Sequence, residues 1–252
     1  VQVEKSVEAM MLYLATLRAG YVFLPLNTAY QSAEIEYFIG NAEPAVVVCS
    51  GKNFGWVSKI AFKQGTQHVF TLNDDRTGSL LDRAAHCSDH HTPHVCGADD
   101  LAAILYTSGT TGRSKGAMLS HGNLLSNAQM LKDYWGWTKT GGPEGRGDVL
   151  IHALPIFHVH GLFVAIHGAL LNGSKMIWMA KFDPKAVIAR LPDATVFMGV
   201  PTLYVRMLGE AALTRQQTSH MRLFIAGSAP LLIETFKEWQ DRTGHTILER
   251  YG

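Results

Sequence analysis

The sequence predicts an α/β fold, and three observations support this class. Segments with helical apolar periodicity alternate with short segments rich in valine, isoleucine and leucine, as expected for a sheet covered by helices. Residues 149–249 contain five such short segments, separated by helical ones. The chain has 252 residues, of which 47% are hydrophobic and 17% charged, which suits one large domain or two small ones and excludes intrinsic disorder.

Three helices are expected in the first hundred residues. The first covers residues 6–18, where apolar side chains recur every three or four positions. They are Val7, Met10, Met11, Leu14 and Leu17. The second begins near Ser32, whose hydroxyl can cap its first turn, and the third covers residues 52–63. The apolar face of the second helix comprises Ile35, Phe38 and Ile39.

Strands are expected between these helices, at residues 22–24, 45–49 and 68–72. The segment 45–49 is apolar throughout, which indicates a strand buried on both faces. Residues 73–100 are polar and interrupt the alternation. This change of composition predicts a connector between two lobes, so we place the domains at 1–99 and 100–252.

The connector is rich in histidine and cysteine. Its residues of these types are His86, Cys87, His90, His91, His94 and Cys96. Their spacing matches no familiar zinc pattern, which favours a solvated connector over a metal site. The three cysteines of the chain cannot all pair with one another, so a disulfide framework is not expected and a reducing compartment such as the cytoplasm fits best.

The charge and hydropathy of the chain exclude two classes of partner. Lys and Arg number 22 against 21 Asp and Glu, so the net charge of +1 gives no basic field for nucleic acid. No apolar run reaches the roughly 20 residues of a membrane-spanning helix. The sequence carries no signal for an oligomeric state.

The second half resumes with a strand at 101–106, then a loop, then a helix over 123–134. Asp183 and Pro184 are positioned as N-cap and first residue of a later helix. The remaining strands are expected at 149–153, 175–179, 195–199, 223–226 and 246–249.

The strongest chemical signal is the sequence Tyr-Thr-Ser-Gly-Thr-Thr-Gly-Arg-Ser-Lys-Gly at 106–116. Four hydroxyl side chains and two glycines occupy positions 107–112, directly after a predicted strand. Glycines let successive amides turn toward one anion, hydroxyls add donors, and Lys115 supplies a positive charge. The pattern favours a polyphosphate-binding loop over a flexible linker. It is not a Walker A loop, because two residues separate Gly112 from Lys115.

This segment resembles the phosphate loop of the adenylate-forming enzymes, the superfamily of acyl-CoA synthetases, luciferase and peptide-synthetase adenylation domains. Further segments resemble motifs of the superfamily in the same order: 17–27, 154–162, 199–204, 226–231 and 249–252. The resemblance implies part of the large N-terminal domain of an acyl-CoA synthetase-like fold, with stacked parallel and mixed sheets and helices packed on them. By this resemblance, the C-terminal domain of that fold is expected to lie outside these 252 residues.

The resemblance also implies which residues bind ATP. The loop would hold the β- and γ-phosphates, Thr107 would give its hydroxyl to Mg²⁺, and Lys115 would assist catalysis through its charge. The implied phosphate-side residues are Thr107, Ser108, Gly109, Thr110, Thr111, Gly112 and Lys115. The implied adenine-side residues are Gly227, Ser228, Ala229, Pro230, Glu249, Arg250 and Tyr251.

The implied acyl pocket comprises His158, Val200, Arg206 and Ser228. His158 would position the carboxylate or gate coenzyme A, with His160 as second choice; from the residues alone, a structural histidine pair is the alternative. The segments around Arg206 and Ser228 resemble the malonyl-CoA synthetase branch, in which the arginine receives the free carboxylate of malonate. A guanidinium suits this role because it pairs with carboxylates bidentately. On spacing alone, Arg206 also fits a solvated helix surface.

The resemblance implies a two-step reaction. A small dicarboxylate, malonate or methylmalonate, reacts with MgATP to give an acyl-adenylate and pyrophosphate, and the thiol of coenzyme A then displaces AMP. Two alternatives stay open: an acyl- or aryl-CoA synthetase for a monocarboxylic acid, and a non-catalytic ATP-binding or scaffold protein on the same fold. Because the sequence starts on Val1 and stops within a nucleotide-binding motif, we expect a piece of a longer protein, inactive by itself.

Overall fold

The computed structural model describes residues 1–107, 113–140, 145 and 147–251. The chain divides into two compact units, Val1–Asn123 and Leu124–Gly252, each of which is described by itself. We expected the division at residues 99 and 100, and the contacts place it later. The reason is that the strand at 101–107 belongs to the first unit, where Phe23 forms a parallel bridge with Ala103.

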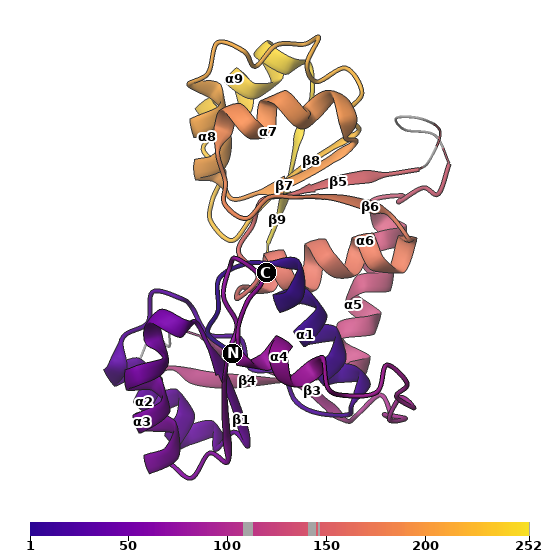
Figure 1. The fold of residues 1–252 in the computed structure, drawn as a ribbon. Helices are drawn as coiled ribbons and strands as arrows, with labels where there is room; N and C mark the ends of the chain where they lie inside the picture. The colour runs from indigo at the N-terminus through magenta and orange to yellow at the C-terminus, as the bar shows by residue number, and fades with distance from the viewer. Residues whose placement is uncertain (108–112, 141–144, 146, 252) are drawn as a thin grey trace. The chain divides into compact units, whose positions relative to one another are not determined.

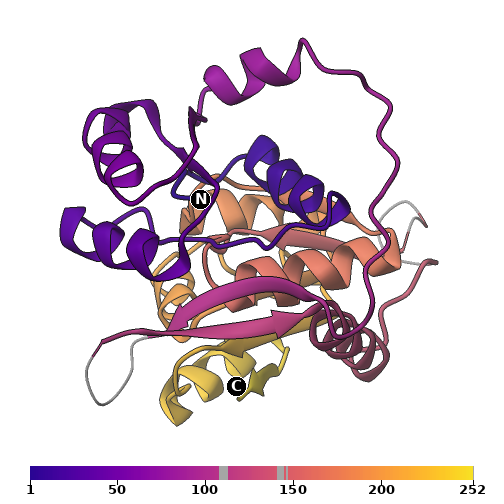
Figure 2. The same ribbon diagram turned by 90° about the horizontal axis from the view of Figure 1, so that it is seen from below.

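The first unit contains two separate two-stranded sheets flanked by helices (Figure 1). Its helices are α1 (Val7–Arg18), α2 (Ser32–Ala42), the short 3₁₀ helix η1 (Gly51–Asn53), α3 (Phe54–Lys63) and α4 (Ser79–Ala84). Its strands are β1 (Val46–Cys49), β2 (His68–Thr71), β3 (Leu101–Thr107) and β4 (Lys115–Ser120). β1 and β2 are parallel, whereas β3 and β4 form an antiparallel hairpin, whose two strands lie side by side in Figure 2.

The core of the first unit confirms the predicted face of α2. Ile35, Phe38 and Ile39 are buried in one cluster with residues of β1 and α3. In α1, Ser6 caps the first turn by accepting the N–H of Ala9 at 3.0 Å. The predicted face of α1 is partly wrong.

The buried residues of α1 are Ala9, Met10 and Tyr13, whereas Val7 and Met11 are exposed. The Tyr13 ring packs edge-on against Phe23, with ring centroids 5.0 Å apart. The buried face of α1 therefore includes an aromatic residue and differs from the face that aliphatic spacing alone suggested.

Three further elements of the first unit differ from expectation. Residues 22–24 form only the single bridge at Phe23 and no regular strand. The phosphate-loop segment is followed by β4, which the sequence analysis did not predict, and α5 (His121–Tyr134) begins directly after β4. Helix α4 lies within residues 73–100, the segment predicted as a connector, where no helix was expected.

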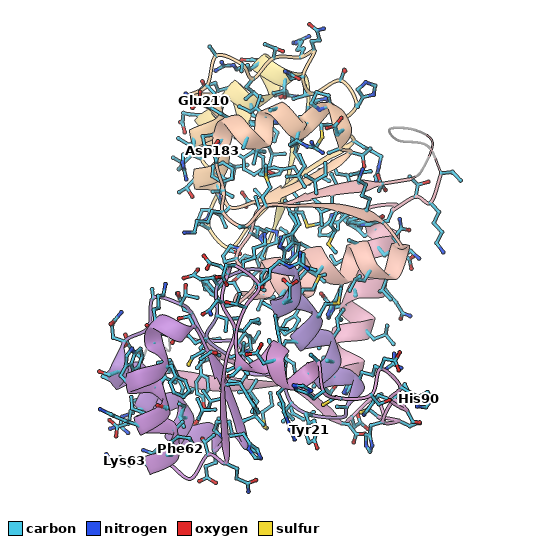
Figure 3. The ribbon with its side chains drawn as sticks, in the orientation of Figure 1. Tyr21, Phe62, Lys63, His90, Asp183 and Glu210 are labelled. Atoms are coloured by element: carbon cyan, nitrogen blue, oxygen red, sulfur yellow. The ribbon has the colours of Figure 1, made fainter. Side chains whose placement is uncertain are left out.

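The connector after α4 contacts the end of α1. The N–H of His94 donates to the carbonyl of Arg18 at 2.9 Å, and Nη2 of Arg18 donates to the carbonyl of His91 at 3.0 Å. Gly20 has a φ of +77°, and a Cβ there would lie 2.4 Å from the His94 ring. His90 lies on the surface (Figure 3). Among the residues described, no three His, Cys, Asp or Glu side chains group as a metal site would require.

The second unit is built on a five-stranded parallel sheet with the order β6-β5-β7-β8-β9. The strands are β5 (Val149–His152), β6 (Lys175–Trp178), β7 (Val196–Gly199), β8 (Leu223–Gly227) and β9 (Ile247–Arg250), all of which the sequence predicted to within two residues at each end. The helices are the π-helix η3 (His160–Ile166), α6 (His167–Asn172), α7 (Pro184–Arg190), the 3₁₀ helix η4 (Leu191–Asp193), α8 (Pro201–Leu208) and α9 (Ile233–Thr243). As predicted, Asp183 caps α7 by accepting the N–H of Ala186 at 2.8 Å.

Helices cover both faces of this sheet (Figure 1). Alternate residues of each strand point to opposite faces, so Ile151 packs with α7, α8 and α9 while Leu150 packs with η3 and α6. This arrangement explains why the strands read as apolar runs without alternation. No helix among the described residues is long and apolar enough to span a bilayer.

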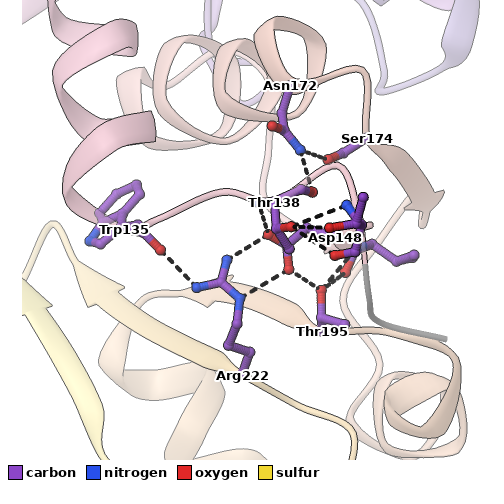
Figure 4. A network of polar contacts seen from close by, with 9 residues as sticks. Trp135, Thr138, Asp148, Asn172, Ser174, Thr195 and Arg222 are labelled. Atoms are coloured by element: carbon purple, nitrogen blue, oxygen red, sulfur yellow. Dashed lines mark hydrogen bonds and ion pairs between the residues drawn. The ribbon is translucent and has the colours of Figure 1, made fainter. Parts of the chain in front are cut away.

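A buried polar network connects the amino ends of three of these strands (Figure 4). Asp148, which precedes β5, accepts two hydrogen bonds from Arg222, which precedes β8, at 2.6 and 3.1 Å. It also accepts the hydroxyl of Thr195, which precedes β7, at 2.7 Å, and the N–H of Thr138 at 2.8 Å. Arg222 donates further to the carbonyl of Trp135 at 2.7 Å. The network therefore fixes the starts of β5, β7 and β8 relative to one another.

The protonation state of Asp148 depends on this network. Burial by itself would raise the pKa of the carboxyl, but the hydrogen bonds from Arg222, Thr138 and Thr195 and the charge of Arg222 outweigh it and hold the pKa below its usual value. A carboxyl with a lowered folded-state pKa stabilises the fold above the pKa of the unfolded chain, about 3.9. That stabilisation is lost as the pH falls through the folded-state pKa.

Replacing Arg222→Gln is expected to lower the free energy of unfolding at pH 7 by about 2–3 kcal/mol, because Asp148 would remain buried without its cation. This is less than the typical cost for a fully buried pair, since the Arg222 side chain is 35% exposed and Asp148 keeps its other donors. Urea denaturation measures the change. The difference from wild type should narrow as the pH falls from the unfolded-state pKa, about 3.9, through the lower folded-state pKa of Asp148, because the wild-type carboxylate is protonated over that interval.

The matched control is Arg190→Gln, which removes a surface ion pair with Asp193 at 3.3 Å. Exposed pairs contribute at most about 1 kcal/mol. Equal destabilisation by the two substitutions would contradict the role given to the Asp148–Arg222 pair.

Candidate active site

The candidate site of the second unit lies where its parallel strands end. The segments that follow β5, β7, β8 and β9 all leave the same edge of the sheet, and they carry His158, Val200, Ser228 and Tyr251. In open α/β sheets, ligands bind outside the carboxyl ends of the strands. The topology therefore brings together four of the segments that the sequence analysis assigned to the acyl pocket and the adenine side.

His160 is the most distinctive side chain at this edge. It is 3% exposed, and neither ring nitrogen has a hydrogen-bond partner among the described residues. A Cβ on Gly227, the last residue of β8, would lie 3.3 Å from its ring. Burial, together with the positive charge of Arg250 on β9, lowers the pKa of His160 to about 4. The imidazole is therefore neutral at pH 7, with one donor and one acceptor facing the strand ends.

The position of His160 depends on contacts around Gly161. The buried His152, in β5, makes a 2.9 Å hydrogen bond through Nε2 with the carbonyl of Gly161 and stacks on Trp178. A Cβ on Gly161 would lie 2.0 Å from the carbonyl oxygen of Pro155, so only glycine fits. The sequence analysis did not single out His152, although a histidine within an otherwise apolar strand was an available signal. The π-helix η3 that begins here is a form often found at functional sites.

His158, the first choice of the sequence analysis, lies in a different environment. Its side chain is exposed and its ring packs against Phe157, with centroids 4.6 Å apart. Partial desolvation lowers the pKa of His158. The structure thus places the two histidines in different roles: His158 is accessible on the surface, whereas His160 is buried against Gly227.

The predicted adenine-side residues come from two segments, and a side chain links them. Oε2 of Glu249, in β9, accepts the N–H of Leu231 at 3.0 Å and so holds the segment that follows β8. Ser228 has a φ of +69°, a conformation that costs energy for a residue with a Cβ. Gly227 pairs with Arg250 in the sheet register. Ser228, Ala229, Pro230 and Tyr251 are exposed at this edge.

Val200 and Arg206 belong to α8. Val200 is the N-cap of the helix and is partly buried. The guanidinium carbon of Arg206 lies 4.8 Å from the ring centroid of Phe182, in the segment after β6, and the side chain is exposed. On the same helix, Val205 is 51% exposed whereas Leu208 is buried. In the part of the chain that the structure describes, the Arg206 guanidinium lies over Phe182 and makes no hydrogen bond with His158 or Ser228.

The predicted phosphate loop belongs to the first unit. Ser108, Gly109, Thr110, Thr111 and Gly112 lie outside the described residues. Thr107 and Lys115 are register partners at the end of the β3–β4 hairpin, and both are exposed. The hairpin therefore brings the predicted Mg²⁺ ligand and the predicted phosphate-binding cation to the same end of two paired strands.

Comparison with known proteins identifies a family and relatives that this chain resembles. The profile of the family described as "AMP-binding enzyme" matches residues 1–252. The mitochondrial malonate–CoA ligase of Homo sapiens is 31% identical over 254 residues, which cover 94% of this chain and 42% of that protein. The malonate–CoA ligase of Arabidopsis thaliana is 29% identical, with coverage of 98% and 43%.

Solved structures agree with these matches. Apo MatB from Rhodopseudomonas palustris superimposes with a TM-score of 0.93 at 56% identity, covering 100% of this chain and 48% of that one. A malonyl-CoA ligase in a ternary product complex with methylmalonyl-CoA and AMP gives a TM-score of 0.77 at 27% identity, covering 99% and 50%. The chain spans about half the length of the proteins it matches.

These matches confirm the predicted resemblance and the α/β fold of an acyl-CoA synthetase N-terminal domain. The family match covers residues 1–252. It therefore includes the five-stranded sheet, the strand ends that carry His160 and Glu249, and the hairpin that carries Thr107 and Lys115. The protein belongs to the AMP-binding enzyme family.

Proposed function

We propose that the protein containing this chain activates malonate, or its methyl derivative, to the coenzyme A thioester through an acyl-adenylate. The observation that carries the proposal is the 56% identity to MatB over the whole chain, together with the curated relatives that are malonate–CoA ligases. An ATP-bound form of the same MatB has also been solved, which supports ATP as a substrate.

In the proposed first step, a carboxylate oxygen attacks the α-phosphorus of ATP and pyrophosphate leaves. The protein contributes by positioning the reactants and stabilising charge. The predicted loop and Lys115 would bind the β- and γ-phosphates, and the segments at 227–230 and 249–251 would flank the adenine. In the second step, the thiol of coenzyme A attacks the acyl carbon and AMP leaves.

The predicted acyl pocket would comprise His158, Val200, Arg206 and Ser228. We add His160 to this set because its neutral ring is buried at the same strand ends with unpartnered nitrogens among the described residues. A neutral imidazole can donate one hydrogen bond and accept another. It can therefore orient a carboxylate or carbonyl oxygen through its N–H while the ring stays uncharged at pH 7.

The described residues fit a magnesium ion that is held mainly by the nucleotide. The exposed hydroxyl of Thr107 is a hard oxygen donor, the type that Mg²⁺ prefers. No larger group of metal-ligating side chains occurs in the part of the chain that the structure describes. The ion would supply neutralisation of phosphate charge, while Thr107 and Lys115 would orient the phosphates from the end of the hairpin.

A reducing compartment, the cytoplasm or the mitochondrial matrix, is proposed as the location. The cysteines are free thiols, with Cys49 buried and Cys87 exposed. Exposed free thiols persist where the surroundings are reducing.

The second candidate function is a coenzyme A ligase for a monocarboxylic acid. It is favoured by one observation: the guanidinium of Arg206 is exposed over Phe182 and contacts neither His158 nor Ser228 among the described residues. Under this alternative Arg206 is a surface residue of α8.

Arg206→Gln in the full-length protein separates the two functions. If Arg206 receives the second carboxylate, the KM for malonate should rise about tenfold or more, because a hydrogen bond to a charged group contributes about 1.5–3 kcal/mol. The KM for ATP should not change. Steady-state AMP formation with malonate measures both constants.

The control is Arg190→Gln, an exposed arginine at the end of α7, which should leave both constants unchanged. An unchanged KM for malonate in Arg206→Gln would refute the dicarboxylate assignment and favour the monocarboxylate alternative.

Pyrophosphate exchange tests adenylation directly. The full-length protein should exchange labelled pyrophosphate into ATP when malonate is present, whereas the isolated 252-residue chain should show little or no exchange. If the full-length protein binds ATP but shows no pyrophosphate exchange, whichever carboxylic acid is added, it is instead a non-catalytic nucleotide-binding protein. Robust exchange by the 252-residue chain alone would show that the rest of the protein is not needed for adenylation.

A further inference from the structure

Helix α2 contacts the strand that leads into the predicted phosphate loop. The ring of Tyr106, in β3, packs on Phe38 with centroids 4.4 Å apart. The hydroxyl of Tyr106 donates to Oδ1 of Asn41 at 2.5 Å. The leading stem of the loop is therefore attached to α2 by one ring contact and one hydrogen bond.

The same helix contacts the residues that return from the loop. The hydroxyl of Tyr37 donates to the carbonyl of Ser114 at 2.7 Å. The guanidinium carbon of Arg113 lies 5.6 Å from the centroid of the Tyr37 ring, within the range of a cation–π contact. Both stems of the loop are thus attached to one helix by side chains that the sequence analysis did not select.

The residues that make these contacts occupy one side of α2. Tyr37 and Asn41 are four positions apart and so lie on adjacent turns of the same face. Phe38 is buried in the cluster that joins α2 to β1 and α3. The attachment points therefore lie on a helix that is itself packed into the core of the first unit.

We propose that α2 positions the two strand ends that carry Thr107 and Lys115 for ATP, and that Tyr37 and Asn41 are the positioning residues. This inference rests on the proposed function, because it concerns the same ATP site. Side chains that are held in place before a ligand arrives lose less conformational freedom when it binds. Fixing the two strand ends that carry Thr107 and Lys115 on a packed helix therefore raises the affinity for ATP.

The test uses Tyr37→Phe in the full-length protein. This substitution removes the hydrogen bond to Ser114 but keeps the ring that contacts Arg113 and Phe38. Tyr37 also borders an open hollow of about 470 Å³, lined by residues of α2 with Arg113 and Ser114, so water can reach the freed carbonyl without a closed cavity forming. We expect the KM for MgATP to rise about three- to tenfold, the range that loss of one hydrogen bond produces, with the KM for the carboxylic acid unchanged.

Asn41→Ala tests the leading stem. Asn41 is exposed, so its truncation leaves the core intact. We expect the KM for MgATP to rise in the same direction, and the double variant with Tyr37→Phe to raise it further. The melting temperature of each variant should stay close to that of wild type.

The matched control is Tyr30→Phe. Tyr30 precedes α2, and its ring centroid lies 5.1 Å from that of Phe38. In the described part of the chain, the contacts with Arg113 and Ser114 are made by Tyr37 and not by Tyr30. Tyr30→Phe should leave the KM for MgATP unchanged. The proposal is overturned if Tyr37→Phe leaves the KM for MgATP unchanged. It is also overturned if the KM for MgATP rises only as far as the protein loses stability, or if the KM for the carboxylic acid rises by the same factor.

The experiment separates this inference from the proposed function. The KM for MgATP can be measured with whichever carboxylic acid supports pyrophosphate exchange in the wild type. If malonate fails and another acid works, the substrate assignment is wrong while the role of α2 remains open to the same measurement with that acid.

Discussion

The ion pair between Asp148 and Arg222 is the contact on which the order of the second unit depends. Leaving the buried carboxylate without its cation would cost about 2–3 kcal/mol, which favours bringing together the segments that carry the two partners. They are the residues before β5 and before β8, and Thr195 before β7 joins them. Once these three strands start at fixed positions, the parallel register follows, and the strands end together at the opposite edge.

The loops that follow the carboxyl ends of the strands lie at this opposite edge, and local contacts set their conformations. Gly161 is pressed against the Pro155 carbonyl and bonded to His152, Ser228 adopts a left-handed conformation, and Glu249 holds the N–H of Leu231. Each of these features fixes backbone or side chains before any ligand binds, which is how a site avoids reorganisation during a reaction.

Much of this organisation could be predicted from the sequence, because apolar runs report burial directly. All five strands of the second unit and the face of α2 follow from such runs.

β4 could not be found this way: most of its residues are exposed, and it exists because its backbone pairs with β3. The buried face of α1 was misjudged because aliphatic spacing gave no weight to Tyr13, whose ring packs against Phe23. The contrast between His158 and His160 also escaped prediction, since two histidines two positions apart give no sign of which one a π-helix turns inward. Tyr37 and Asn41 look like ordinary helix residues until the hairpin is folded against them.

The buried ring of His160 has one more consequence. With a pKa near 4, it keeps the same protonation state throughout the pH range in which cells live. Its pattern of one donor and one acceptor is therefore constant, and the nearby guanidinium of Arg250 is constant as well. The hydrogen-bonding groups that His160 and Arg250 offer to a ligand at these strand ends therefore stay the same across that pH range.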